Sequence, residues 1–305
     1  MKPKLLIILG PTAVGKSELA LRLARGIGAE IVNADSQQVY RYMDIGTGKP
    51  SRADLATVPH HVIDVIDPDE EFNAALYRRL ATRAIDDIRQ RGKRVVVCGG
   101  TGLYLKALTR GLFEGPAQDP ELRKKLEREM EQTGLPALYQ RLVEIDAGVV
   151  STIHPNDRQR IVRALEVYHS TGKPIGAWQR EHAFKEELYD VLKIGLERER
   201  AELYEVINRR SEQMVEAGLL EEVRDLVARG YSLDLKPLRS VGYRQMGAIL
   251  REEKNLEEAL EEMKQETRRL AKRQLTWYRS DPEIRWYHPE KQADEILDTA
   301  HRFFV

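Results

Sequence analysis

The chain has 305 residues, of which 42% are hydrophobic and 32% are charged, and its 49 Lys and Arg residues equal its 49 Asp and Glu residues. This composition predicts a globular protein of one large domain or two smaller ones, and the zero net charge gives no sign of a nucleic-acid partner. The single cysteine, Cys98, excludes an internal disulfide and a cysteine-rich metal site. The first apolar run is too short for a signal peptide and no stretch could span a bilayer, so we expect a cytoplasmic protein.

The first predicted strand, residues 5–9, leads directly into a glycine-rich loop. Residues 10–17 (GPTAVGKS) match G-x-x-x-x-G-K-[ST], and a helical pattern begins at Glu18. Glycines let backbone N–H groups turn toward an anion, Lys16 adds a mobile charge, and the Ser17 hydroxyl suits Mg²⁺. The alternative is a glycine-rich turn with an incidental lysine. We predict a di- or triphosphate site made by Gly10, Thr12, Ala13, Val14, Gly15, Lys16 and Ser17.

Further strands are predicted at residues 30–35, 61–66 and 94–98, with helices at 73–91 and from 103 to 109. Strands that alternate with helices indicate an α/β fold with a parallel sheet, here a P-loop NTPase-like core. Ligands of such sheets bind beyond the carboxyl ends of the strands. Ser17, Asp35 and Thr101 are all expected at that edge.

The segment 111–120 contains two Pro and two Gly residues and indicates a domain boundary. The chain then shows helical patterns at 120–133, 136–145 and 156–170, and a strand resumes the α/β pattern at 191–196. Long helices are predicted at 198–229 and 256–279, with a last edge strand at 284–287. We therefore predict a helical insertion, residues 115–189, within a core formed by residues 1–114 and 190–305.

Two residues at the predicted strand ends could carry chemistry. Asp35 could act as a general base, lie near Mg²⁺, or only cap a turn. Thr101 could hydrogen-bond a substrate or cap the helix that follows it. The strand at 94–98 ends in Cys-Gly-Gly rather than in the acid that P-loop ATPases use to organise water. This disfavours ATP hydrolysis as the main reaction, although Asp64 or Asp67 could serve as that acid.

Basic side chains are concentrated in three places: residues 158–163, residues 239–244, and the last long helix, where Arg268, Lys272 and Arg273 lie. Spacings of three and four would place several of these charges on one stripe, as binding to a phosphate backbone requires. The alternative for the last helix is a solvated face whose charges are compensated by its own glutamates. Trp277 and Tyr278, in the same helix, are more often core residues than base-stacking platforms.

Eight segments, taken together and in this order, resemble the tRNA dimethylallyltransferase family, also called isopentenyl-diphosphate:tRNA transferases. The segments are 10–17 (GPTAVGKS), 33–40 (NADSQQVY), 43–50 (MDIGTGKP), 99–104 (GGTGLY), 154–160 (HPNDRQR), 163–168 (RALEVY), 241–246 (VGYRQM) and 270–277 (LAKRQLTW). The phosphate loop alone is generic, but the combination is specific and the resemblance covers nearly the whole chain.

The resemblance implies that the loop holds the diphosphate of dimethylallyl diphosphate together with Mg²⁺. The implied acceptor is the exocyclic 6-amino group of the adenine 3′ of the anticodon, in the anticodon stem-loop of tRNAs that read codons beginning with U. Asp35 would accept a proton from this amine, and Thr101 would help to hold the adenine or the diphosphate. The implied RNA contacts are Ser36, Gln37, Gln38, Arg123, Gln159, Arg160, Arg163, Arg239, Gly242, Arg244 and Arg273. No obligate protein partner is implied, so a monomer is expected.

Two other functions agree with part of the sequence. A P-loop kinase acting on a small metabolite would bind ATP tightly without RNA, but the missing acid and the Arg-rich helices weigh against it. A nucleotide-gated RNA-binding protein without catalysis would explain the basic helices but would leave Asp35 without a role.

Overall fold

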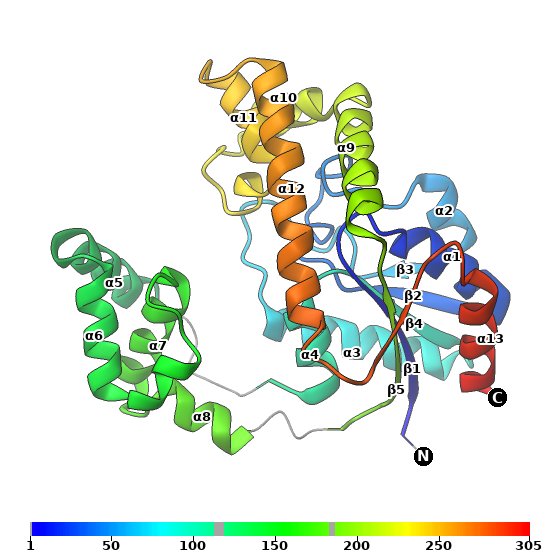
Figure 1. The fold of residues 1–305 in the computed structure, drawn as a ribbon, viewed down its shortest axis with the longest axis horizontal. Coiled ribbons are helices and arrows are strands. Elements are labelled where there is room, and N and C mark those ends of the chain that lie inside the picture. Colours follow the sequence, from blue (N-terminus) through cyan, green and yellow to red (C-terminus); the bar gives the residue numbers. More distant parts are fainter. Residues whose placement is uncertain (1, 113–118, 183–186) are drawn as a thin grey trace. The chain divides into compact units, whose positions relative to one another are not determined.

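The computed structural model describes residues 2–112, 119–182 and 187–305. The chain forms two compact units: Met1–Thr109 together with Glu187–Val305, and Arg110–Glu186 (Figure 1). The predicted boundary between residues 114 and 115 lies outside the described residues.

The larger unit is built on a six-stranded parallel sheet with the strand order β3-β2-β4-β1-β5-β6. The strands are β1 (Lys4–Leu9), β2 (Ala29–Asn33), β3 (His60–His61), β4 (Arg94–Cys98), β5 (Asp190–Leu196) and β6 (Ile284–Tyr287). The prediction of an α/β fold with a parallel sheet is confirmed. Because β4 lies between β1 and β2, the segments that follow these three strands leave the sheet side by side.

Helices cover both faces of this sheet (Figure 1). Leu6 and Ile8 of β1 belong to the core cluster of one face, whereas Leu5 and Ile7 belong to that of the other, because side chains alternate along a strand. The helices of this unit are α1 (Lys16–Ile27), α2 (Arg52–Thr57), α3 (Ala74–Gln90), α4 (Gly102–Arg110), α9 (Arg200–Glu216), α10 (Leu219–Ala228), α11 (Tyr243–Leu250), α12 (Leu256–Tyr278) and α13 (Ala293–Phe304), with a short 3-10 helix, η2 (Pro237–Arg239).

The smaller unit contains only helices among its described residues: α5 (Pro120–Thr133), α6 (Leu135–Ile145), η1 (Ala147–Ser151), α7 (Arg158–Thr171) and α8 (Ile175–His182). Asp119 and Asp157 cap the N-termini of α5 and α7, because their carboxylates accept backbone N–H groups of the first turn. The unit has its own core, which includes Leu126, Leu142 and Ile161.

Two predicted elements differ from the structure. The strand predicted at 61–66 is reduced to β3, because Val62 and Asp64 adopt left-handed backbone conformations, with φ angles of 62° and 53°, that no strand can continue. The single helix predicted at 198–229 is two helices, α9 and α10. Gly218, with a φ of 99°, interrupts them.

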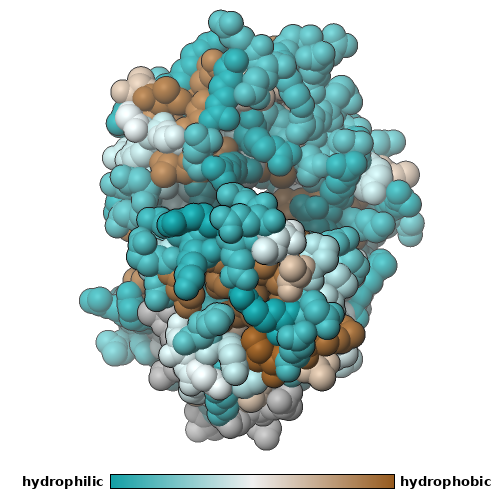
Figure 2. All heavy atoms as spheres, turned by 90° about the vertical axis from the view of Figure 1, so that its left-hand side faces the viewer, coloured by the Kyte–Doolittle hydropathy of each residue, from teal (hydrophilic) through white to brown (hydrophobic). Residues whose placement is uncertain are grey.

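Hydrophilic residues predominate on the face of the molecule drawn in Figure 2, and the hydrophobic residues form scattered areas between them. Within the part of the chain that the structure describes, no helix has the length and apolar composition needed to cross a membrane.

Candidate functional site

The predicted phosphate loop connects β1 to α1, as its sequence motif requires. Gly10 has a φ of 144°, and a Cβ atom there would lie 2.6 Å from the carbonyl oxygen of Leu196, so only glycine fits at the end of β1. Gly15, with a φ of 105°, is the N-cap residue of α1. Val14 is fully buried beneath the loop, while Thr12 and Ala13 are partly exposed.

Lys16 and Ser17 begin α1 and complete the loop. The Lys16 ammonium donates a hydrogen bond to the carbonyl oxygen of Pro11 at 2.6 Å. Burial lowers the pKa of Lys16 to about 8, against the opposing effect of Cys98 and Asp35 nearby. Ser17 is exposed. The loop therefore presents the Lys16 ammonium and the exposed Ser17 hydroxyl next to the N-terminus of α1, which is a favourable arrangement for binding an anion.

Asp35 and Thr101 follow β2 and β4, and the structure brings their backbones together. Gly99 permits this approach, since a Cβ atom there would lie 2.2 Å from the carbonyl oxygen of Ala34. Thr101 Oγ1 accepts the backbone N–H of Ser36 at 3.0 Å, and Thr101 N donates to Ala34 O at 3.1 Å. The Thr101 hydroxyl therefore fixes the turn that carries Asp35; the substrate contact proposed for it stays a prediction.

Asp35 lines a cavity of about 120 Å³ together with residues of the phosphate loop. Asp35 Oδ1 accepts the backbone N–H of Gln37 at 2.8 Å, which holds the carboxylate in place. The cavity is lined by Thr12, Ala13, Asp35, Gln37, Gly46, Thr47, Ile207, Arg210, Ser211, Met214, Ser240, Val241, Met263, Thr267 and Leu270. Among these described residues Asp35 is the only carboxylate, and one part of the wall is apolar.

Arg210 of α9 lines the same cavity, and sequence reasoning missed it. Burial lowers the pKa of Arg210, and the Asp35 carboxylate opposes this effect. Its side chain forms no ion pair with any carboxylate in the described part of the chain. An arginine held beside a cavity without such a partner is suited to an anionic ligand. The spacing of the sequence could have identified Arg210, because Leu203, Ile207 and Arg210 recur at helical intervals and therefore lie on one face of α9.

Gln274 of α12 is a second residue that sequence reasoning missed. Its Oε1 accepts the backbone N–H of Thr12 at 2.8 Å, and its Nε2 donates to the carbonyl oxygen of Gly100 at 2.9 Å. One amide therefore ties the phosphate loop to the segment that follows β4. It also uses one of the loop N–H groups, so Thr12 N is not free to meet an anion in this structure.

Ser36, Gln37 and Gln38 lie beside Asp35, as predicted, but they differ in their surroundings. Gln37 lines the cavity, and its buried Oε1 has no hydrogen-bond partner among the described residues. Gln38 is buried, and its Nε2 donates to the carbonyl oxygens of Thr47 and Gly48, both at 3.1 Å. Gln37 is thus the residue of this group that faces the cavity, whereas the Gln38 amide supports the neighbouring loop.

The loop 44–47 forms part of the cavity wall and is held from outside by one carboxylate. Glu222 of α10 accepts the backbone N–H groups of Asp44 (2.9 Å), Ile45 (2.7 Å) and Gly46 (3.2 Å). The Tyr243 hydroxyl also donates to Glu222, at 2.6 Å. These four bonds fix the position of Gly46 and Thr47 in the wall.

The larger unit contains four further predicted RNA contacts, Arg239, Gly242, Arg244 and Arg273. Arg239 and Arg244 are exposed and flank Ser240 and Val241, which line the cavity; Gly242 between them is buried. Arg239 pairs with Asp234 at 3.8 Å, and Arg244 pairs with Glu262 at 3.1 Å. Arg273 is exposed on α12. The structure therefore brings a basic turn to the edge of the cavity.

The other predicted RNA contacts belong to the smaller unit. Gln159 and Arg160 are exposed at the start of α7, and Arg123 is partly exposed on α5. Arg163 forms an ion pair at 3.1 Å with Glu166, which is fully buried. This pairing gives Arg163 a structural role, whatever its contact with RNA, because removing it would leave a buried carboxylate without its cation.

No group of three or more His, Cys, Asp or Glu side chains that could hold a metal ion occurs in the described residues. Side-chain oxygen atoms near the phosphate loop include the Thr12 and Ser17 hydroxyls and the Asp35 carboxylate. Such a sparse oxygen set fits Mg²⁺ that is bound chiefly by substrate phosphates, since Mg²⁺ commonly keeps few protein ligands.

Comparison with known proteins decides the family. A family model described as IPP transferase matches residues 38–281. This chain belongs to the IPP transferase family. The tRNA dimethylallyltransferase 1 of Citrifermentans bemidjiense is 53% identical over 304 residues, covering 100% of this chain and 98% of that protein. The tRNA dimethylallyltransferase of Geobacter sulfurreducens is 51% identical, covering 99% of this chain and 97% of that protein.

Solved structures of IPP transferases agree with this assignment. The tRNA isopentenylpyrophosphate transferase of Bacillus halodurans has a TM-score of 0.73 and 39% identity, covering 99% of this chain and 97% of that chain. A eukaryotic dimethylallyltransferase acting on tRNA has a TM-score of 0.83 and 28% identity, covering 99% of this chain and 79% of that chain. The predicted family and P-loop NTPase-like fold are confirmed. The roles predicted for individual site residues stay predictions.

Proposed function

We propose that this IPP transferase transfers a dimethylallyl group from dimethylallyl diphosphate to the 6-amino group of the adenine 3′ of the anticodon, in tRNAs that read codons beginning with U. The observation that carries this proposal is the cavity that Asp35 shares with the phosphate loop and Arg210. The names of the tRNA dimethylallyltransferases with about half of their residues identical support the same reaction.

The cavity has an apolar part and a positively charged part, which match the apolar chain and the anionic diphosphate of dimethylallyl diphosphate. Ile207, Met214 and Leu270 supply an apolar wall for a five-carbon chain, while Arg210 and the phosphate loop supply positive charge for the diphosphate. The wall composition therefore suits an isoprenoid diphosphate as the ligand of the loop.

In the proposed reaction the adenine 6-amino nitrogen attacks the first carbon of the dimethylallyl group. The carbon–oxygen bond to the diphosphate breaks, and its electron pair leaves with the diphosphate. Asp35 accepts the proton that the nitrogen loses, and Lys16 and Arg210 stabilise the negative charge that develops on the leaving group. Gln37 lines the cavity and is the proposed hydrogen-bond partner of the adenine edge.

Mg²⁺ is proposed as the cofactor, with the Ser17 hydroxyl as a ligand and the diphosphate supplying most of the remaining oxygens. Bound there, the ion would add positive charge against the leaving diphosphate. The exposed hydroxyl of Ser17 at the start of α1 and the absence of a carboxylate cluster among the described residues support this assignment.

The adenine must leave the stacked anticodon loop to reach Asp35. Extrusion from a single-stranded loop costs about a few kcal/mol, which contacts with the flanking phosphates can offset. Arg239 and Arg244, beside the cavity-lining Ser240 and Val241, are the proposed contacts at the cavity edge.

The test is to incubate the protein with an unmodified anticodon stem-loop and dimethylallyl diphosphate, and to measure the RNA by mass spectrometry. We expect one added five-carbon unit, and none on a stem-loop that has guanosine in place of the target adenosine. Asp35→Asn keeps the shape of the side chain but removes the proton acceptor, so turnover should fall by about 100- to 10,000-fold while both substrates still bind. Full turnover by Asp35→Asn, or a product on the guanosine RNA, would contradict the proposal.

A further inference from the structure

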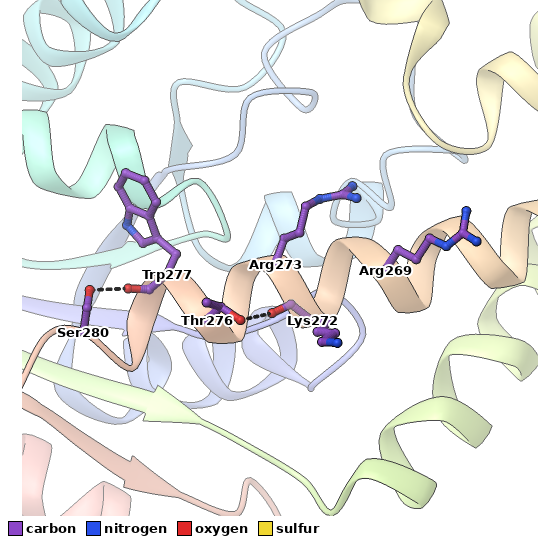
Figure 3. Close-up of a pocket in the computed structure, with 6 residues that line it drawn as sticks. All are labelled: Arg269, Lys272, Arg273, Thr276, Trp277 and Ser280. Carbon is purple, nitrogen blue, oxygen red and sulfur yellow. Dashed lines mark hydrogen bonds between the residues drawn. The ribbon is translucent and has the colours of Figure 1, made fainter. Parts of the chain in front are cut away.

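An open surface pocket of about 640 Å³ lies on α12, outside the cavity described above (Figure 3). It is lined by Arg269, Lys272, Arg273, Thr276, Trp277 and Ser280, and it is called the α12 pocket below. Arg269, Arg273 and Trp277 are spaced four residues apart and extend from the same side of the helix (Figure 3). The pocket therefore combines positive charge with an aromatic ring on one helix face.

Two of the three cations that line the α12 pocket are not neutralised by other described residues. Lys272 and Arg273 are exposed, and no ion pair or hydrogen bond of their side chains to other described residues is found. Arg269 pairs with Glu266 on the preceding turn, at 2.5 Å. No acidic residue lines the pocket in the described part of the chain. Two cations without a partner in the described part of the chain form a site that is complementary to phosphate groups.

Trp277 connects this pocket to the active-site segment. Its side chain is 42% exposed. Its indole also lies close against Gly102, since a Cβ atom added there would be 2.2 Å from Trp277 Nε1. Gly102 directly follows Thr101, whose hydroxyl holds the turn that carries Asp35. An aromatic face next to the active-site segment is therefore open to a ligand.

We infer that the α12 pocket binds a nucleotide that flanks the target adenosine in the RNA. The base of this nucleotide stacks on Trp277, and Lys272 and Arg273 hold the phosphates on either side of it. A base and its phosphates present the combination of aromatic surface and negative charge that the pocket complements. This inference rests on the proposed function, and it adds a second base-binding position beside that of the adenine.

The experiment measures equilibrium binding of a fluorescently labelled, unmodified anticodon stem-loop by anisotropy, without the isoprenoid substrate. We expect Trp277→Ala to raise the Kd by about 10-fold, as the loss of one base–aromatic stack does, and Trp277→Phe to stay within about 3-fold of the wild type. Lys272→Gln and Arg273→Gln should each weaken binding and lower the dependence of Kd on salt by about one phosphate contact. Arg22→Gln, an exposed cation of α1 outside the pocket, is the control and should change neither quantity.

A double-mutant cycle identifies the stacked base. An abasic residue is placed on the 5′ side or on the 3′ side of the target adenosine, and both RNAs are tested with wild-type protein and with Trp277→Ala. We expect one of the two abasic RNAs to bind wild type about 10-fold more weakly and to show no further loss with Trp277→Ala, because the stack is already absent. Equal effects of Trp277→Ala on the intact RNA and on both abasic RNAs would overturn the inference.

Two further outcomes separate this inference from the proposed function. If Trp277→Ala weakens dimethylallyl diphosphate binding as much as RNA binding, the residue supports the cavity and the stacking role is wrong. If the wild type alkylates the stem-loop but Trp277→Ala, Lys272→Gln and Arg273→Gln leave RNA binding unchanged, only the α12 pocket assignment fails. If the wild type neither binds nor alkylates the RNA, both proposals fail.

Discussion

Arg210 lines the cavity, although nothing in its immediate sequence distinguishes it from the neighbouring arginine. In the sequence it is one of two adjacent arginines, Arg209 and Arg210, within a helix rich in charge. In the structure its position on the stripe of Leu203 and Ile207 turns it toward the cavity, while Arg209 is exposed. Neighbouring residues of one type can therefore differ completely in their surroundings, because successive helix positions point about 100° apart.

Lys16 leads to a prediction about pH. Because burial lowers its pKa to about 8, from 10.5, the free protein loses the Lys16 charge as the pH rises through about 8. The charged form is the one that attracts diphosphate, so affinity falls with rising pH. We expect the Kd for dimethylallyl diphosphate, measured by calorimetry, to rise by about 10-fold between about pH 7 and about pH 9. The Lys16→Arg control keeps its charge and should flatten the profile; a Kd that does not change with pH in the wild type would contradict the assignment.

At the scale of elements, the loop 44–47 and α10 act together, because Glu222 accepts three backbone N–H groups of the loop. Glu222→Gln exchanges one acceptor oxygen for an N–H₂ group that would face these donors. We expect the free energy of unfolding, measured with urea, to fall by about 1–3 kcal/mol, and KM for dimethylallyl diphosphate to rise because Gly46 and Thr47 line the cavity.

Glu221→Gln is the matched control for this prediction. Glu221 is the preceding residue of α10 and is exposed, and its one ion-pair partner among the described residues is Arg224, one turn along the helix. Its substitution should change the free energy of unfolding by less than about 0.5 kcal/mol and leave KM unchanged. Equal effects of the two substitutions would show that Glu222 does not position the loop.

The sequence could predict those parts of the site that follow strands. The phosphate loop, Asp35 and Thr101 each end a short apolar run, and parallel strands bring their carboxyl ends to one edge. Gln274 and Glu222 could not be predicted, because their partners are 262 and 176–178 positions away and depend on how helices pack. The break at Gly218 was missed because Gly218 lies within a pattern that is helical on both sides. Residues that follow strands could thus be predicted from the sequence, whereas the residues that position them through helix packing could not.

At the scale of the whole molecule, the two units have separate hydrophobic cores. Ten buried hydrophobic residues of the helical unit, between Leu126 and Leu165, form a cluster of their own, and among the described residues the two clusters of the sheet contain none from that unit. Each core can therefore melt by itself. We expect two transitions in calorimetry, with the smaller unit unfolding at the lower temperature because its core is smaller.

Replacing residues 110–186 by a Gly/Ser linker tests this division. The variant should lose the lower transition, keep the upper one within a few degrees, and bind dimethylallyl diphosphate as the full chain does. Its affinity for the anticodon stem-loop should be lower if Arg123, Gln159 and Arg160 contact RNA as predicted. A single cooperative transition in the full chain, or an unfolded variant, would contradict the independence of the two cores.

Two consecutive residues of helix α12 face different parts of the protein, a surface pocket and the phosphate loop. Arg273 lines the α12 pocket, whereas Gln274 accepts the backbone N–H of Thr12 in the phosphate loop. A helix that contacts both proposed binding sites would make the two affinities thermodynamically linked whenever either substrate shifts it. Linkage is reciprocal, so the factor by which the diphosphate changes RNA affinity must equal the factor by which RNA changes diphosphate affinity. Titrating RNA in the presence of diphosphate and diphosphate in the presence of RNA should therefore give the same coupling factor. The size of this factor would measure how strongly binding of one ligand affects binding of the other.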